Sequence, residues 1–429
     1  MKRPHTRTAL LYLTAVVAGA LIGFIGGAFR WCLMTADRLR GELVEWSHAA
    51  PGPGWLVPVA VAAAGAALAA LIVRWVPLAS GSGIPHVEAV YRGDVGAPTL
   101  LVLPARFIGG VLSIGSGLVL GREGPTVHMG AVIGAESARQ ARLPDADIRL
   151  MQTAVGGAGL AVAFNAPIAG TLFALEEVTK SFRLEAVLAT LFAAATAVSC
   201  MRWMLGNNPD FDVAAIPAPD LAWLPLFIVF GLLTGLLGAA YNRNVIWFLD
   251  RIARLPRPPV VAKAAIIGAV IGLAIIIYPL SVGGGDPLTQ MILSGQQVAM
   301  PVIIGLLLVR FLAGPLSYAA AVPGGLFAPL LALGALWGLL FIGGLDAVWG
   351  GEVTALAIPM ALVGMAAFFG ATVRAPLTGI VVVIEMTATT SVAVPMLAAT
   401  AAAVLVSSLT GTPPIYDSLG ERMGPPPPR

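Results

Sequence analysis

The sequence predicts an all-α polytopic membrane protein whose two halves are related to each other. Of its 429 residues, 58% are hydrophobic and only 11% are charged, whereas soluble domains carry about 25% charged residues. The mean hydropathy of the whole chain is +0.89, which leaves little room for a soluble protein. In addition, short segments rich in glycine and proline recur in the same order in both halves.

Ten apolar segments are separated by loops, and several are long enough to cross a membrane, because about 20 helical residues span the hydrocarbon core. They lie near residues 9–34, 55–78, 99–120, 184–204, 221–249, 260–280, 299–320, 324–343, 353–373 and 391–410. Five segments are short and broken by glycine and proline, at 82–92, 124–137, 149–164, 167–178 and 376–386. Hydrocarbon cannot satisfy the backbone groups that such breaks expose, so these five are expected inside the protein or beside an aqueous cavity.

The charged residues predict how the chain is oriented. Basic residues gather at the N-terminus, between residues 243 and 263 and in the C-terminal tail, whereas residues 207–220 hold three aspartates and no lysine or arginine. Because basic loops stay in the cytoplasm, we expect a multi-pass protein of the cell (inner or plasma) membrane with both termini cytoplasmic. The apolar run from residue 9 to 29 is too long for the core of a signal peptide, so it is interpreted as a first transmembrane helix.

Composition and motifs argue against several other classes of function. The net charge of +3 gives no indication of nucleic-acid binding. Cys32 and Cys200 are isolated from each other, so neither a disulfide nor a metal site is expected, and no cofactor is expected either. The chain has no Gly-x-Ser-x-Gly, His-Glu-x-x-His or Walker motif, and its four histidines are scattered, which disfavours a membrane-embedded enzyme.

Two broken segments of the first half recur in the second. Gly121-Arg122-Glu123-Gly124-Pro125 matches Gly325-Leu326-Phe327-Ala328-Pro329 at an offset of 204. The run 165–170 matches 374–379 at an offset of 209, and Glu176 and Glu385 each stand six residues after the end of their run. Gly and Pro are abundant here, so coincidence is the alternative, but two colinear matches favour a repeat. Such paired interruptions are typical of transporters with a binding site between repeats.

The repeats divide the chain into four expected parts. Residues 1–205 form membrane repeat 1, and residues 206–220 form a loop on the outside. Residues 221–412 form membrane repeat 2, and residues 413–429 form a short C-terminal helix with a proline-rich cytoplasmic tail.

Three motifs precede predicted short helices: 81–85, 121–125 and 324–329. Each combines glycine, which allows close backbone approach, with a proline suited to a first helical turn. The first N–H groups of a helix lack intrahelical partners and carry the positive end of its dipole, so converging helix starts can bind an anion without a fixed cationic side chain. Ser82 adds a hydroxyl donor at one such start. The alternative for each motif alone is a tight helix–helix contact.

Glu123 is the most informative of these residues. A carboxylate at a helix start can occupy the place of a bound anion, and protonation would neutralise and release it, so that anion binding and proton binding become linked. An ion pair with the adjacent Arg122 is the alternative role for Glu123. Because sequence neighbours need not face each other, we instead expect Arg122 to fix the loop by hydrogen bonding to backbone carbonyls.

Glu176 and Glu177 follow an apolar run and precede Lys180 and Arg183. For one of the two carboxylates, the simple interpretation is a solvated helix end with these basic residues as partners. Since Glu385 matches Glu176 in the repeat, that pair is expected to share a structural task, which leaves Glu177 as the candidate for proton uptake. Tyr416, considered alone, is typical of an interfacial aromatic residue.

Together these residues resemble the CLC family of chloride channels and proton-coupled anion transporters. The family motifs G-S-G-I-P, G-R/K-E-G-P and G-x-F-x-P stand at 81–85, 121–125 and 325–329, in order and at similar spacing. The resemblance covers nearly the whole chain. It implies a CLC-type fold of two inverted-topology repeats of tilted and broken helices, embedded in the lipid bilayer as a homodimer with one pathway per subunit. No nucleotide-binding CBS domain is expected after the membrane region, as in many bacterial members.

By this resemblance, chloride would be bound by the hydroxyls of Ser82 and Tyr416 and the backbone N–H groups of Leu326 and Phe327. Glu123 falls on the external gating glutamate, and Glu177 falls on the internal proton-transfer glutamate of the exchangers. Members with serine and tyrosine at these places favour chloride. The supporting motif residues are Gly81, Gly83, Pro85, Gly121, Arg122, Gly124, Pro125, Gly325 and Pro329.

The resemblance implies a chloride/proton antiporter with chloride and protons as its substrates. The alternative is a passive chloride channel, gated by voltage or pH, on the same scaffold; Glu177 favours exchange because family channels usually have an apolar residue there. The chain departs from the family pattern at His86, where an acidic residue is frequent, at His128, where an amide is common, and at Lys180-Ser181, where some exchangers have a Pro-Gln-like pair.

Overall fold

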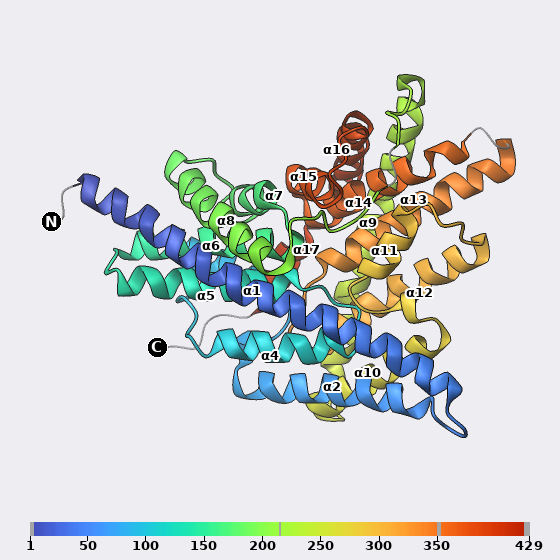
Figure 1. Cartoon of the computed structure of the whole chain (residues 1–429), viewed down its shortest axis with the longest axis horizontal. Coiled ribbons are helices and arrows are strands. Elements are labelled where there is room, and N and C mark those ends of the chain that lie inside the picture. The colour runs from blue at the N-terminus through green and yellow to red at the C-terminus, as the bar shows by residue number, and fades with distance from the viewer. Residues whose placement is uncertain (1–3, 214–215, 350–352, 424–429) are drawn as a thin grey trace.

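The computed structural model describes residues 4–213, 216–349 and 353–423, and these ranges are almost entirely helical (Figure 1). The helices of the first half are α1 (Pro4–Ala49), α2 (Leu56–Trp75), η1 (Pro77–Ala79), α3 (Ile84–Arg92), α4 (Val102–Gly115), α5 (Glu123–Gln140), α6 (Asp145–Phe164), α7 (Pro167–Phe173), η2 (Ala174–Val178) and α8 (Leu184–Leu205). Within the described ranges no strand forms, and isolated bridges join Gly81 to Pro323 and Gly121 to Gly325.

The second half repeats this order. Its helices are η3 (Leu221–Trp223), α9 (Leu224–Arg254), α10 (Val260–Ile277), η4 (Pro279–Ser281), α11 (Asp286–Leu293), α12 (Met300–Tyr318), α13 (Phe327–Trp349), η5 (Thr354–Leu356), α14 (Ala357–Val373), α15 (Pro376–Thr387) and α16 (Ala393–Leu409), followed by α17 (Ile415–Gly420) and η6 (Glu421–Met423). Helix for helix, α1 to α8 therefore correspond to α9 to α16. The motif helices are not uniformly short, since α5 and α13 have 18 and 23 residues.

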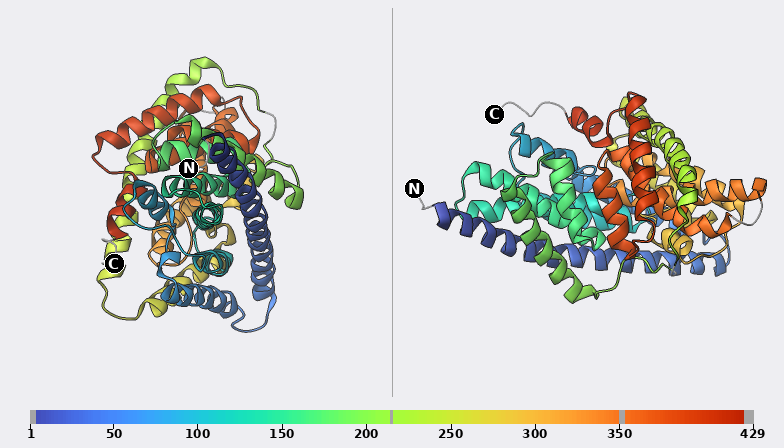
Figure 2. Two further views of the ribbon diagram at one scale, coloured as in Figure 1. Left: turned by 90° about the vertical axis from the view of Figure 1, so that its left-hand side faces the viewer. Right: turned by 90° about the horizontal axis from the view of Figure 1, so that it is seen from above.

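Eight helices in the described part of the chain are long and apolar enough to cross a membrane, which makes this a multi-pass membrane protein. The longest is α1, which has 46 residues and runs along an edge of the molecule in both views of Figure 2. At about 1.5 Å per residue it is roughly 70 Å long, more than twice the hydrocarbon thickness. It extends beyond the apolar segment at 9–34 because the polar residues that follow are good helix formers, and Asp37 pairs with Arg40 one turn later at 2.7 Å.

Close glycine contacts join α5 to α6 and, in the second half, α13 to α14. A Cβ added to Gly134 would lie 2.3 Å from the Met151 carbonyl oxygen, and one added to Gly338 would lie 2.4 Å from that of Met360. Only glycine allows the helix backbones to approach so closely. The helices α6 and α14 are buried along most of their length, whereas α2 and α10 leave apolar side chains exposed for lipid to cover.

The contact between α7 and α15 shows that the two halves run in opposite directions. Glu176, in the η2 turn that follows α7, accepts hydrogen bonds from the N–H groups of Leu377 (3.0 Å) and Thr378 (2.7 Å) at the start of α15. Glu385, near the end of α15, accepts from Ile168 (3.1 Å) and Ala169 (2.8 Å) at the start of α7. This reciprocal pair confirms the shared structural task expected of the two glutamates.

For Glu176, the same contact corrects the simple interpretation of a solvated helix end with basic partners. Glu176 caps a helix of the other repeat, and Lys180 pairs instead with Asp417 at 3.5 Å. The sequence pattern could not show this, because α15 lies about 200 residues further along the chain.

Candidate anion site

The three glycine- and proline-containing loops meet at one place between the repeats. Gly121 and Gly325 exchange two backbone hydrogen bonds of 2.8 Å, which join the starts of α5 and α13. The loop before α3 joins them, because Gly81 donates to the Val322 carbonyl at 3.1 Å and accepts from Gly324 at 3.2 Å. The three motifs that the sequence singles out are therefore joined to one another by backbone hydrogen bonds.

Gly124 fixes how closely these loops approach. A Cβ at this position would lie 2.8 Å from the Ser82 Cα and 3.2 Å from the Gly325 Cα. In the loop before α3, Gly81 and Gly83 have φ values of +59° and +83°, a region that glycine adopts readily. The prolines of the three motifs, Pro85, Pro125 and Pro329, lie in the first turn of α3, α5 and α13.

Glu123 places its carboxylate on the start of α13. The side chain is completely buried, and Oε1 accepts a hydrogen bond of 2.7 Å from the backbone N–H of Phe327, the first residue of that helix. Its second oxygen, Oε2, has no hydrogen-bond partner among the described residues. The N–H groups of a first helical turn have no intrahelical acceptor, so the carboxylate occupies donors that an anion could use.

Arg122 does not pair with Glu123. Its Nε donates to the Ala163 carbonyl at 2.7 Å, as expected of a residue that fixes the loop. Its terminal nitrogens also form ion pairs with Asp286 at 2.9 Å and Asp210 at 3.1 Å. Asp210 lies in the loop between the repeats and binds Arg30 of α1 as well, at 2.8 Å.

Sequence reasoning missed these partners of Arg122, although two signals pointed to them. Arg30 is a charged residue inside an apolar segment, which marks a site at membrane depth. Asp286 lies in Gly283-Gly284-Gly285-Asp286-Pro287, which matches the 81–85 motif at an offset of 202. Nothing in the sequence indicates that Asp210 folds back onto α1 and α5.

Tyr416 lies beside the start of α13 and is completely buried, so its interpretation as an interfacial aromatic is wrong. Its ring centroid is 5.5 Å from that of Phe327, and its hydroxyl has no hydrogen-bond partner within the described ranges. Ser82 is 1% exposed, donates its N–H to the Tyr318 hydroxyl at 3.2 Å and accepts from the Ile84 N–H at 3.3 Å. Leu326 is also fully buried, between Gly325 and Phe327.

Glu177 lies in the η2 turn after α7, outside the three loops that meet at Glu123. It is 4% exposed, and the charged groups that act on it are Glu88, Lys180, Asp417 and its neighbour Glu176. Glu88 of α3 is also buried, at 3% exposure, and its Oε1 has no partner in the described part of the chain. The structure therefore groups several carboxylates around Glu177, whereas the charged group that acts on Glu123 is Arg122.

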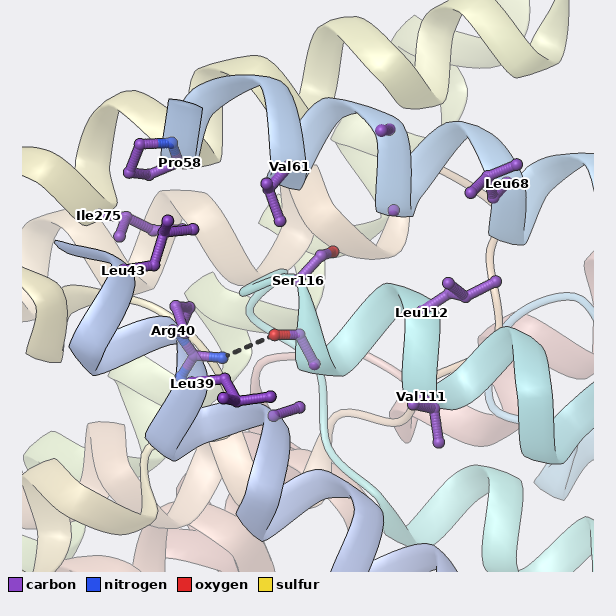
Figure 3. Close-up of a pocket in the computed structure, with 14 residues that line it drawn as sticks. Leu39, Arg40, Leu43, Pro58, Val61, Leu68, Val111, Leu112, Ser116 and Ile275 are labelled. Atoms are coloured by element: carbon purple, nitrogen blue, oxygen red, sulfur yellow. Dashed lines mark hydrogen bonds between the residues drawn. The ribbon is translucent and has the colours of Figure 1, made fainter. Parts of the chain in front are cut away.

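Two other features differ from the anion site. No group of three or more histidine, cysteine or acidic side chains in the described ranges is arranged to hold a metal ion. A cavity of about 390 Å³ lies between α1, α2, α4 and α10, but its lining is apolar except for Arg40 and Ser116 (Figure 3). There Arg40 donates to the Gly115 carbonyl at 3.0 Å, so the cavity offers no cluster of backbone donors comparable to that at Glu123.

Comparison with known proteins places these features in a wider group. A family model described as "Voltage gated chloride channel" matches residues 64–408. The H(+)/Cl(-) exchange transporter ClcA of Vibrio cholerae serotype O1 is 35% identical over 98% of this chain and 91% of its own length. The protein of the same name from Salmonella typhimurium is 34% identical over 98% of this chain and 89% of its own.

Solved structures agree in fold. A slow cyanobacterial Cl⁻/H⁺ antiporter superposes with a TM-score of 0.91 at 30% identity and covers 99% of both chains. A eukaryotic CLC transporter gives a TM-score of 0.80 at 23% identity, over 96% of this chain and 74% of the other. A CLC-type fluoride/proton antiporter gives 0.80 at 22% identity, over 97% and 98%; at these lower identities the likeness concerns the fold alone.

Proposed function

The chain belongs to the voltage-gated chloride channel (CLC) family, and from this premise we propose that it exchanges chloride for protons across a membrane. The observation that carries the proposal is the hydrogen bond from the Phe327 N–H to the Glu123 carboxylate. The same donor cannot serve a carboxylate and a chloride ion at once. Relatives and a solved structure named as chloride/proton exchangers support this choice over a passive channel.

Glu123 acts as the gate in this proposal. While its carboxylate is charged it competes with chloride for the N–H groups at the start of α13, with the charge-assisted hydrogen bond favouring the carboxylate. A proton on Glu123 removes the charge and weakens this bond, so chloride can take the place. Each passage of chloride through the donors then requires the carboxylate to leave, and that links the two substrates.

Chloride itself would be bound by groups that lie around the same point. Tyr416 offers a fully buried hydroxyl beside the start of α13, and this hydroxyl forms no hydrogen bond within the described part of the chain. The Ser82 hydroxyl and the N–H groups of Leu326 and Phe327 complete the donor set of the proposal. Neutral donors suit transport, since a fixed cation in direct contact would hold the ion too tightly to release it.

Glu177 is the proposed internal proton acceptor. It is buried among other carboxylates, with Glu88 and Asp417 close enough to act on its charge. Like charges in a poorly solvated place favour protonation of one member. Protons would reach Glu123 from this cluster, while chloride follows the donors of the central site.

The proposal includes the assembly and orientation of the protein. All of the proposed site residues come from one chain, so a homodimer would hold one complete pathway in each subunit. The basic segments would face the cytoplasm, with both termini there and the 206–220 loop outside, in the cell (inner or plasma) membrane.

Reconstitution in liposomes tests the function. Vesicles loaded with concentrated chloride are diluted into low chloride at equal pH, with valinomycin and potassium to clamp the membrane potential at zero. An antiporter drives protons into the vesicles as chloride leaves, so the external solution becomes more alkaline. Chloride efflux without any change in external pH would instead identify a passive channel, and no efflux would refute both.

A further inference from the structure

A buried arginine holds the loop that leads into Ser82. Arg106 of α4 is completely buried, and its guanidinium donates to the backbone carbonyls of Leu78 (2.8 Å), Ser80 (2.9 Å) and Gly81. A carbonyl oxygen is the negative end of its peptide group. With these three oxygens bound to Arg106, none of them is free to face an anion beside Ser82.

The second half contains the same arrangement. Arg310 of α12 is also completely buried, and it donates to the carbonyls of Leu280 (3.2 Å), Val282 (3.0 Å) and Gly283 (3.0 Å). These three residues follow their counterparts in the first half by 202 positions. The arginine and its three carbonyls are therefore part of the repeated unit rather than a local accident of packing.

Each arginine lies directly against the glycine at the start of the next helix. A Cβ on Gly83 would be 2.7 Å from a terminal nitrogen of Arg106, and one on Gly285 would be 2.6 Å from the same nitrogen of Arg310. Gly83 adjoins Ser82 in sequence, so the guanidinium contacts the loop one residue away from the proposed chloride ligand.

Only the first copy adds histidines behind its arginine. The Arg106 Nε donates to the His128 Nδ1 at 3.0 Å, and the His128 Nε2 lies 3.2 Å from the His86 Nδ1. In the second copy Ala332 and Leu288 stand at the equivalent positions, and the Arg310 Nε has no partner among the described residues. The histidines are thus found in the copy that carries Ser82. The second copy has Gly284 at the position that matches Ser82.

Hydrogen-bond chemistry sets the state of both rings. An arginine Nε–H can only donate, so the His128 Nδ1 must be an unprotonated acceptor and its proton must be on Nε2. That N–H then donates to the His86 Nδ1, which places the His86 proton on Nε2 as well. Both imidazoles are therefore neutral in this arrangement, and they orient Arg106 without adding charge.

No carboxylate in the described part of the chain balances the charge of Arg106. Its guanidinium forms no ion pair within the described part of the chain, and the groups that act electrostatically on Arg106 do not include an aspartate or glutamate. A buried cation without a counter-ion is costly, and a bound anion nearby offsets part of that cost. The histidines fix the direction in which this charge acts.

We propose that Arg106, oriented by His128 and His86, is a positioning residue for the anion: it shapes the Ser82 loop and supplies a positive charge behind it. The inference rests on the proposed function for the identity of the anion, and it gives His86 and His128 a role in orienting Arg106. Arg106 does not touch the ion, so it can strengthen binding without preventing release.

Chloride titration by calorimetry tests the proposal on the full-length protein in detergent, with isethionate as the background anion. Arg106→Met is expected to weaken chloride binding about tenfold, and His128→Leu severalfold, because it leaves the Arg106 Nε without an acceptor. His128→Gln should bind like the wild type, since the amide oxygen can accept from Arg106 while its NH₂ donates to His86.

Arg310→Lys and Arg106→Lys form a matched pair, because both arginines are buried and both hold three carbonyls. We expect Arg106→Lys to weaken binding clearly more than Arg310→Lys. Equal losses in the pair, or unchanged binding in His128→Leu, would overturn the proposal. A wild-type protein that binds no chloride would refute the proposed function itself. This outcome differs from failure of the inference alone, in which the wild type binds chloride but the variants do not differ as expected.

Nitrogen NMR of histidine provides a readout independent of folding defects in the variants. The chain has only four histidines, so ¹⁵N-labelled wild-type protein gives a spectrum that single His86→Gln and His128→Gln variants assign. Between pH 6 and 8 both buried rings should be neutral Nε2–H tautomers. An imidazolium, or an Nδ1–H tautomer at His128, would contradict the arrangement.

Discussion

At the scale of single residues, the site depends on which group occupies the N–H of Phe327. Glu123 holds it at 2.7 Å and leaves its other oxygen without a partner in the described part of the chain. Glu177 is buried elsewhere, among Glu88 and Asp417. The two acids therefore lie in different surroundings, which allows one to control the anion and the other to pass a proton.

Glu123→Ala is expected to uncouple the anion from the proton. Without the carboxylate nothing competes for the donors, so chloride should cross at a rate that does not change between pH 4.5 and 7.5. The wild-type rate should rise as the pH falls, because a proton on Glu123 frees the donors for chloride. Chloride efflux from proteoliposomes at several pH values measures this. Continued proton transport in the variant would show that another acid serves as the gate.

Glu177→Gln is expected to stop proton movement rather than to change chloride movement. The amide cannot carry a proton, but it has nearly the shape of the acid, so proton movement should fall to background while chloride still passes. Simultaneous recording of chloride and pH in the same vesicles checks this. Exposed Glu42→Gln is the matched control, and proton coupling that survives in Glu177→Gln would point to Glu88 instead.

The sequence could single out residues that lie within short motifs, but not most of those that act through distant contacts. Glu123, Ser82 and Phe327 could be singled out because glycine and proline mark the helix starts at which they stand. Asp210 could not, because its partners Arg30 and Arg122 belong to helices far from it in sequence. Arg106 and Arg310 left a detectable signal, since each is an arginine within an apolar segment and they are 204 residues apart.

At the scale of helices, the reciprocal contacts between α7 and α15 hold the repeats together. Each helix start receives a carboxylate from the end of the other, so four backbone N–H groups without intrahelical acceptors are satisfied. Helix boundaries in the sequence were predicted closely where glycine or proline marks them, as at α15. The C-terminal part of α1 was missed because its polar residues carry no membrane signal.

Glu176→Ala removes one of these two caps and should lower stability without changing the anion site. Loss of a helix cap typically costs about 0.5–2 kcal/mol, and Glu385→Ala should cost a similar amount because its contacts mirror those of Glu176. Thermal unfolding in detergent measures the change against Glu42→Ala. Variants as stable as the wild type would show that the caps do not hold the repeats together.

At the scale of the whole molecule, two related halves of opposite direction bring their broken segments to one point. The recurrence of the Gly/Pro motifs at nearly equal offsets predicted the repeat, and the resemblance to the CLC family implied its inverted topology. The halves are not equivalent at that point. Both supply helix starts, but only the first supplies a carboxylate, and the position matching Glu123 in the second half is Phe327.

This asymmetry leads to the central claim, that the Glu123 carboxylate and chloride compete for the same donors. Calorimetric titration of chloride into wild-type protein and Glu123→Ala at pH 7.5 tests it most directly. A charge-assisted hydrogen bond contributes about 1.5–3 kcal/mol, so removing the competitor should lower the chloride dissociation constant at least about tenfold. An unchanged or higher dissociation constant in Glu123→Ala would contradict the claim.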